Sequence, residues 1–141
     1  GHDLANVPQV LHLWREGARR LSRTDARYAS EAFLNCRVHH LLAGPLAQGR
    51  SVVVWGAGPV GKSFARALQA RGTPVTAFVD LDPRKIGQEI HGAPVLNTAQ
   101  GLEIRGPLHA AAVGQPGARG RIEALLEGGG MVAGEDFVAV A

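Results

Sequence analysis

The sequence predicts an α/β fold in which a parallel sheet is covered by helices on both faces. Runs of apolar, β-branched residues alternate with helical stretches from Ser51 onward, which is the pattern of doubly wound sheets. The first of these runs, SVVVWG, is apolar at almost every position, as expected for a central strand that is buried on both faces. With 141 residues, 45% hydrophobic and 19% charged, the chain has the length and composition of a globular protein with one main domain.

The chain divides into two regions. Residues 1–48 are predicted to form an N-terminal helical extension or a linker from an upstream domain, and residues 49–141 the sheet domain. Within the first region, PQVLHLWRE has an extended character, and TDARYASEAFLNCRVHHLLAG predicts a helix that Thr24 or Asp25 caps and Gly44 ends. The predicted buried face of this helix consists of Tyr28, Ala32, Leu34, Val38, Leu41 and Leu42. We expect this face to pack either on the sheet or on a second copy of the chain. The second arrangement would form a homodimer.

The sheet domain is read as strands alternating with helices. After SVVVWG, the segment PVGKSFARALQARG predicts a helix and PVTAFVD the second strand. Residues 81–101 are rich in turn residues and contain two short strand-like pieces. The remaining predicted elements are a strand in PLHAAAVG, a helix in ARGRIEALLEGGG and a closing strand in DFVAVA. We predict five parallel strands in the order 3-2-1-4-5.

The loop after the first strand satisfies two phosphate-binding patterns. Gly56, Gly58 and Gly61 form the G-x-G-x-x-G of a Rossmann dinucleotide fold, whereas Gly56 to Ser63 also match the P-loop of nucleoside triphosphatases. Both patterns place phosphate at a helix N-terminus. Ala65, four residues after Gly61, favours close packing of a helix on a strand, and this supports the Rossmann reading.

An acidic residue at the end of the second strand also favours the Rossmann reading. Asp80 follows Gly61 by about 20 residues, where such folds place the carboxylate that accepts hydrogen bonds from a ribose. The sequence therefore predicts a Rossmann-like doubly wound sheet. The residues expected to bind its nucleotide are Gly56, Gly58, Val60, Gly61 and Asp80. Because Asp80 repels a 2′-phosphate, NAD(H) is expected over NADP(H), although Arg84 and Lys85 weaken that preference.

Two segments resemble known families. The order FVD-x-DP-x-KIG-x-x-IHG-x-PVL, followed by AAAVGQPGARGRI, resembles the Rossmann-like N-terminal domain of nucleotide-sugar N-acyltransferases and the nucleotide-binding domain of some sugar-nucleotide dehydratases. This resemblance implies that His91 faces a sugar nucleotide and that Arg119 meets a phosphate. The segment LHLWREGARRLSRTDARYASEAFLNCRVHHLLAGPL resembles the one that follows the catalytic domain in some bacterial family 2 glycosyltransferases, which implies such a domain upstream.

Most other chemistry is disfavoured by residue types and spacing. The only tyrosine, Tyr28, has no lysine four residues later, which excludes a Tyr-x-x-x-Lys proton-transfer pair. No G-x-S-x-G elbow is present, and the histidines, including His109, are expected at the surface or in caps rather than as metal ligands. The net charge of +3 is spread along the chain, which does not favour nucleic acid. A single cysteine, Cys36, and no apolar run near 20 residues fit a cytoplasmic protein without a membrane span.

Two hypotheses of function remain open. The first is a noncatalytic module, attached to a glycosyltransferase, that binds NAD(H) or a sugar nucleotide. The second is a fragment of an NAD-dependent oxidoreductase or of a sugar-nucleotide-modifying enzyme. The start at Gly1-His2, without Met, suggests an excised piece of a longer protein.

Overall fold

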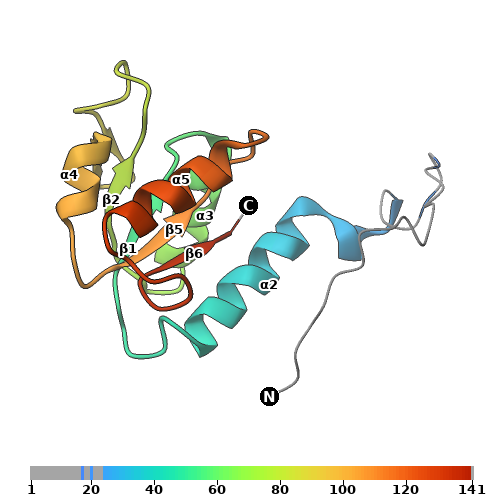
Figure 1. Cartoon of the computed structure of the whole chain (residues 1–141). Helices are drawn as coiled ribbons and strands as arrows, with labels where there is room; N and C mark the ends of the chain where they lie inside the picture. The colour runs from blue at the N-terminus through green and yellow to red at the C-terminus, as the bar shows by residue number, and fades with distance from the viewer. Residues whose placement is uncertain (1–16, 18–19, 21–23, 141) are drawn as a thin grey trace, which may run out of the picture.

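The computed structural model describes Gly17, Arg20 and residues 24–140. Its core is a six-stranded sheet in the order β3-β4-β2-β1-β5-β6 (Figure 1). Every pair of neighbouring strands is parallel except β3 and β4, which are antiparallel. The strands are β1 (Val52–Trp55), β2 (Val75–Val79), β3 (Glu89–Ile90), β4 (Ala93–Leu96), β5 (Leu108–Ala111) and β6 (Phe137–Ala139).

The five parallel strands have the predicted order, and the Rossmann-like α/β class is confirmed. The prediction of only five strands is wrong, because the hairpin before β4 adds a short antiparallel edge.

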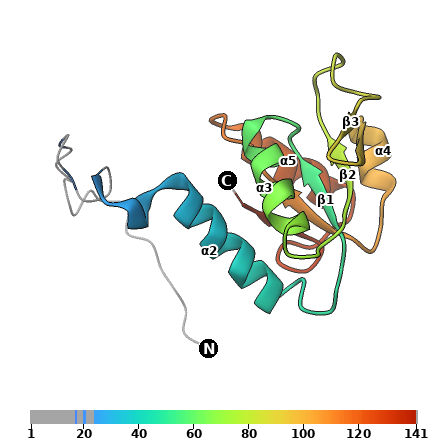
Figure 2. The same ribbon diagram turned by 180° about the vertical axis from the view of Figure 1, so that it is seen from behind.

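Helices cover both faces of the sheet, as a comparison of Figures 1 and 2 shows. They are α2 (Ser30–Ala43), α3 (Pro59–Gln69), α4 (Thr98–Glu103) and α5 (Ala118–Gly128), with a 3-10 turn η1 (Ala26–Tyr28). Side chains from α2 and α3 pack with Val52 and Val54 on one face. Side chains from α4 and α5 pack with Val53 and Trp55 on the other. The strictly apolar β1 is therefore buried on both faces, for the reason its composition suggested.

The N-terminal helix packs on the sheet domain through its second half. Val38 and Leu41 are buried in the same core cluster as α3, and Leu34 and Leu42 pack at its edge. Tyr28, predicted to be buried, is 45% exposed, because it precedes α2 and lies in η1. The helix ends before Gly44 as predicted. The extended piece predicted in residues 8–16 lies outside the described residues.

The predicted N-terminal cap of this helix is wrong. The residue that precedes α2 is Ala29, which offers no side-chain cap. Asp25 instead accepts a hydrogen bond from the backbone N–H of Arg27 at 2.9 Å and fixes the 3-10 turn. Thr24 donates its hydroxyl to the carbonyl oxygen of Arg20 at 3.2 Å. Both side chains thus stabilise the turn before α2 rather than α2 itself.

The segment between β2 and β5 contains a helix that the sequence analysis did not predict. The helix α4 begins with a capping box, in which the side chain of Asn97 accepts from the backbone of Gln100 and the side chain of Gln100 accepts from the backbone of Asn97. A side-chain amide at Asn97 followed three residues later by the amide of Gln100 is a capping-box pattern, and it could have predicted the start of this helix. In the part of the chain that the structure describes, no helix is both long and apolar enough to cross a membrane.

Candidate nucleotide-binding site

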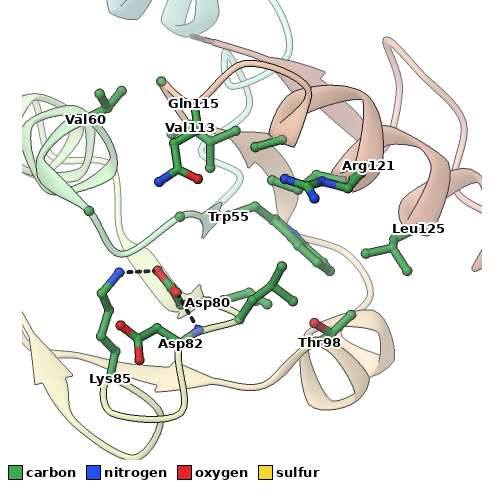
Figure 3. A pocket seen from close by; sticks show the side chains of 18 of the residues that line it. Trp55, Val60, Asp80, Asp82, Lys85, Thr98, Val113, Gln115, Arg121 and Leu125 are labelled. Carbon is green, nitrogen blue, oxygen red and sulfur yellow. Dashed lines mark hydrogen bonds and ion pairs between the residues drawn. The ribbon is translucent and has the colours of Figure 1, made fainter.

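A pocket of about 690 Å³ lies at the carboxyl ends of β1, β2 and β5 (Figure 3). Here β1 has β2, the next strand of the parallel order along the chain, on one side and β5, which follows α4, on the other. Such a switch in strand order is the usual ligand position in doubly wound sheets. Its lining comes from the glycine loop, the loop after β2, the start of α4, the loop after β5 and one side of α5. The polar lining residues are Asp80, Asp82, Lys85, Thr98, Gln115 and Arg121, and the larger apolar ones are Trp55, Val60, Val79, Leu81, Val113, Ile122 and Leu125.

The three glycines of the loop have different structural roles. Gly56 has a φ of +111°, and a Cβ there would lie 2.7 Å from the side chain of Val113. At Gly61, a Cβ would overlap the carbonyl oxygen of Gly56, because the helix packs directly against the loop. Gly58 lines the pocket, has an ordinary negative φ, and a Cβ there would meet no atom within 4 Å. Gly56 and Gly61 are therefore required by the fold, whereas the bare backbone of Gly58 leaves room for a ligand.

The pocket lies at the N-terminus of α3. Pro59 occupies the first turn, and the backbone N–H groups of Val60 and Gly61 belong to the helix end that has no intrahelical acceptors. Val60 lines the pocket, while Gly61 is buried behind it. The partial positive charge of this helix end favours an anion at the pocket wall.

Asp80 connects the loop after β2 to the glycine loop. Its Oδ2 accepts from the backbone N–H of Ala57 at 2.8 Å and from Nζ of Lys85 at 2.9 Å, and its Oδ1 accepts from the N–H of Asp82 at 2.9 Å. Burial by itself raises the pKa of Asp80, but these hydrogen bonds outweigh it, so the pKa lies below the usual value. The carboxylate is thus charged, paired with a lysine, and 12% exposed at the pocket wall.

The neighbouring Asp82 is also ionised. Its hydrogen bonds with Arg84 lower its pKa to about 2. Asp82 lines the pocket, whereas Arg84 lies outside the lining and is 88% exposed. The β2 side of the pocket is therefore the acidic side.

The α5 side of the pocket combines apolar walls with one cation. Ile122 and Leu125 line it, and the guanidinium of Arg121 points into it (Figure 3). Arg119, the residue expected to meet a phosphate, does not line the pocket; its Nε donates to Oε1 of Glu123 at 3.0 Å, one turn further along the helix. Arg119 thus lies outside the pocket and Arg121 lines it, because the two residues lie on different faces of α5.

Behind the pocket lies a buried pair that the sequence analysis did not predict. Trp55 lines the pocket, and its indole N–H donates to Nδ1 of His109 at 2.9 Å. Nε2 of that histidine lies 3.1 Å from the carbonyl oxygen of Ile104, so the indole and the carbonyl together favour the tautomer with hydrogen on Nε2. Burial lowers the pKa of His109, and the bond to Ile104 opposes this shift. The expectation of a surface or cap position for His109 is therefore wrong: it is a neutral core residue whose place on β5 gives it two polar partners.

His91 does not belong to the pocket. It occupies the turn of the β3–β4 hairpin with a φ of 51°, and its carbonyl oxygen accepts from Nε2 of Gln69 at the end of α3. Because α3 begins at the pocket and runs away from it, this contact places His91 toward the amino end of the sheet. The resemblance implied that His91 faces a sugar nucleotide, but this residue does not line the pocket. Within the described residues, no group of three or more His, Cys, Asp and Glu side chains is arranged to hold a metal ion.

Comparison with known proteins adds a family and a fold relationship. Residues 48–131 match the CoA binding domain. The structure of RSP, a Rex-family repressor, resembles this one with a TM-score of 0.54 at 16% identity over 84% of this chain and 65% of RSP. The structure of RSP in complex with β-NADH gives a TM-score of 0.51 at 15% identity over 64% and 52% of the two chains. These identities establish the fold alone, and the aligned part spans less than two thirds of each RSP chain. No curated protein sequence gives a significant match.

Proposed function

The chain belongs to the CoA-binding domain family, and from this premise we propose that residues 49–141 bind a nucleotide that contains adenosine 5′-diphosphate, either CoA or NAD(H). The observation that carries this proposal is the open position at Gly58, where bare backbone faces the pocket at the N-terminus of α3. Gly56 and Gly61 are explained by the fold, but nothing in the fold requires a glycine at Gly58. Close approach of a diphosphate to the backbone supplies that reason.

Both candidate ligands contain adenosine 5′-diphosphate, and CoA carries an additional phosphate on the 3′-oxygen of its ribose. The RSP structure that resembles this chain contains β-NADH, and the family takes its name from CoA. In the proposed complex the diphosphate lies at Gly58 and Val60, and the ribose lies beside Asp80. Asp80 already accepts three hydrogen bonds, which leaves the carboxylate room for about one more.

We propose that the module binds its ligand without chemical conversion. Among the described residues that line the pocket there is no His, Cys, Ser or Tyr, and the amine of Lys85, which does line it, is paired with Asp80. Hydrogen bonds from backbone N–H groups and from neighbouring cations hold the carboxylates of Asp80 and Asp82 ionised by lowering their pKa values, which makes them poor general acids. A binding or sensing role is consistent with this composition.

We also propose that residues 1–48 connect this module to a glycosyltransferase catalytic domain. The support is the resemblance of residues 11–46 to the segment that follows such domains. In this arrangement a cytoplasmic enzyme carries a nucleotide-responsive tail. Expression of the parent protein with and without residues 49–141 would test it: transfer activity that responds to nucleotide only in the longer form is the expected result.

Calorimetric titration of the chain with CoA, NADH, NADPH, a UDP-sugar and ATP-Mg tests the binding proposal. CoA or NADH should bind, and Gly58→Val should abolish that binding because the new side chain fills the phosphate position. Gly120→Val is the matched control, since a Cβ at Gly120 also meets no atom within 4 Å, yet Gly120 lies outside the pocket lining. Equal binding by Gly58→Val and the wild type would refute the site. Binding of the UDP-sugar alone would replace the adenosine nucleotide with a sugar nucleotide.

A further inference from the structure

We propose that Arg121 makes the pocket selective for nucleotides with a 5′-diphosphate over monophosphates and nucleosides. This inference rests on the proposed function and assigns a specific residue to the recognition of the second phosphate. The structure places Arg121 in the pocket lining, whereas the sequence resemblance implied that Arg119, two residues earlier, meets a phosphate.

The surroundings of Arg121 leave its guanidinium available. On the same helix, Arg119 pairs with Glu123, and near the pocket Arg84 pairs with Asp82 and Lys85 with Asp80. Within the described part of the chain, no hydrogen bond or ion pair is found for the guanidinium of Arg121. Its guanidinium nevertheless points into the pocket rather than away from the molecule (Figure 3).

Arg121 faces the wall that the glycine loop forms. A diphosphate placed against Gly58 and Val60 receives backbone N–H groups on one side only, because α3 contributes only that wall. The other side of the diphosphate faces α5. There Ile122 and Leu125 are apolar, so Arg121 is the cation that α5 contributes to the pocket lining. An arginine fork is well suited to two phosphate oxygens.

The charges of the pocket also give the nucleotide a direction. Asp80 and Asp82 are ionised at the β2 side, and Arg121 lies on the α5 side. Lys85 pairs with Asp80, so Asp82 gives this side its remaining negative charge. A nucleotide with its ribose toward Asp80 and its phosphates toward Arg121 offers hydroxyl donors to a carboxylate and phosphate oxygens to a guanidinium, whereas the reverse direction moves the phosphates away from Arg121. The second phosphate, which lies further from Asp80, gains most from Arg121.

The experiment compares the affinities of ADP, AMP and adenosine for the wild type, Arg121→Ala, Arg121→Lys and Arg119→Ala. The wild type should prefer ADP over AMP. Arg121→Ala should weaken ADP by about tenfold, the scale of one solvent-accessible charge-assisted contact, and leave adenosine unchanged. Arg121→Lys should keep part of the preference, and it should decrease at high salt. Arg119→Ala, a control on the same helix, should behave as the wild type does. Circular dichroism confirms that each variant is folded.

The outcomes separate this inference from the proposed function. Binding of ADP by the wild type with an unchanged ratio of ADP to AMP affinity in Arg121→Ala overturns the role of Arg121 and leaves nucleotide binding intact. Equal losses in Arg121→Ala and Arg119→Ala also overturn it, since they show a general effect of charge. A wild type that binds none of the adenosine compounds overturns the proposed function and this inference with it.

Discussion

The two ends of the sheet use their arginines in different ways. At the amino end, Arg50 precedes β1 and donates to three backbone carbonyl oxygens: to Gly106 at 2.9 Å, to Glu135 at 2.8 Å and to Pro107 at 3.3 Å. These carbonyls belong to the loops that lead into β5 and β6. At the carboxyl end, Arg121 points into a pocket of about 690 Å³. The first guanidinium is used by the protein itself, and the second is available to a ligand.

This difference shows how the fold separates stability from binding. Loops at the amino end are joined by hydrogen bonds within the chain, so the elements that support the site are fixed before any ligand arrives. At the carboxyl end of the sheet, three groups surround open space: the N-terminus of α3, the carboxylate of Asp80 and the guanidinium of Arg121. Large apolar side chains are also exposed here: Val60, Leu81 and Leu125 all line the pocket, and each is more than a third exposed. An exposed apolar rim next to polar groups is typical of a ligand site.

Gly61 is the exception at the carboxyl end, and it gives the largest expected effect. Gly61→Ala places a methyl group against the carbonyl oxygen of Gly56. Gly56 is itself closely packed, since a Cβ there would lie within 3 Å of the side chain of Val113 and the carbonyl oxygen of Ala112. We expect a loss of about 3 kcal/mol or more in the free energy of unfolding, measured by chemical denaturation. Gly58→Ala, in the same loop, should change stability by less than about 1 kcal/mol. Similar stabilities for the two variants would contradict the division of roles among the glycines.

Removing the guanidinium at the amino end should give the next largest effect. Arg50→Ala leaves three carbonyl oxygens without their charged donor, two of them at exposed positions where water replaces it. We therefore expect a loss of about 1 to 3 kcal/mol in unfolding free energy, with nucleotide affinity unchanged. Arg121→Ala is the matched comparison and should have the opposite profile: unchanged stability and weaker ADP binding. A stability loss shared equally by both variants would remove the contrast between the two ends.

The sequence contained most of the fold because its signals are local. An apolar run such as Val52–Trp55 and the glycines after it specify a buried strand and a close turn, and the alternation of such strands with helices indicates a parallel sheet. Two short strand-like pieces were expected in residues 81–101, where β3 and β4 lie, but the antiparallel direction of β3 was not predicted, because two residues carry too little pattern to assign a strand direction. The cap at Asp25 was misplaced because a side chain that caps an α-helix is also suited to cap a shorter turn.

The candidate site was less predictable, since side-chain direction depends on the helix phase. Arg119 and Arg121 are two residues apart, which is about 200° around a helix. An error of two residues in the position of the arginine therefore places its guanidinium outside the pocket instead of inside it. His109 and Trp55 are 54 positions apart, and only the pairing of β1 with β5 brings them together. Asp80 follows its strand directly, so its place at the pocket was predictable, but its bond to Lys85 depends on the loop conformation.

The last and smallest expected effect concerns Lys85, which determines how Asp80 reads the ribose. Asp80 alone predicts a preference for NADH over NADPH, because its charge repels a phosphate on the ribose. In the structure, Nζ of Lys85 lies 2.9 Å from Oδ2 of Asp80 and compensates that charge. The preference of the wild type should therefore be weak.

Lys85→Met leaves the carboxylate uncompensated and removes a cation that would attract the extra phosphate. Both changes weaken NADPH, so we expect the ratio of NADH to NADPH affinity to rise by about three- to tenfold in calorimetric titration. Arg84→Met is the matched control, because Arg84 pairs with Asp82 rather than with Asp80. If the ratio stays the same in Lys85→Met, the ribose does not lie beside the pair of Asp80 and Lys85, and the direction proposed for the nucleotide in the pocket is wrong.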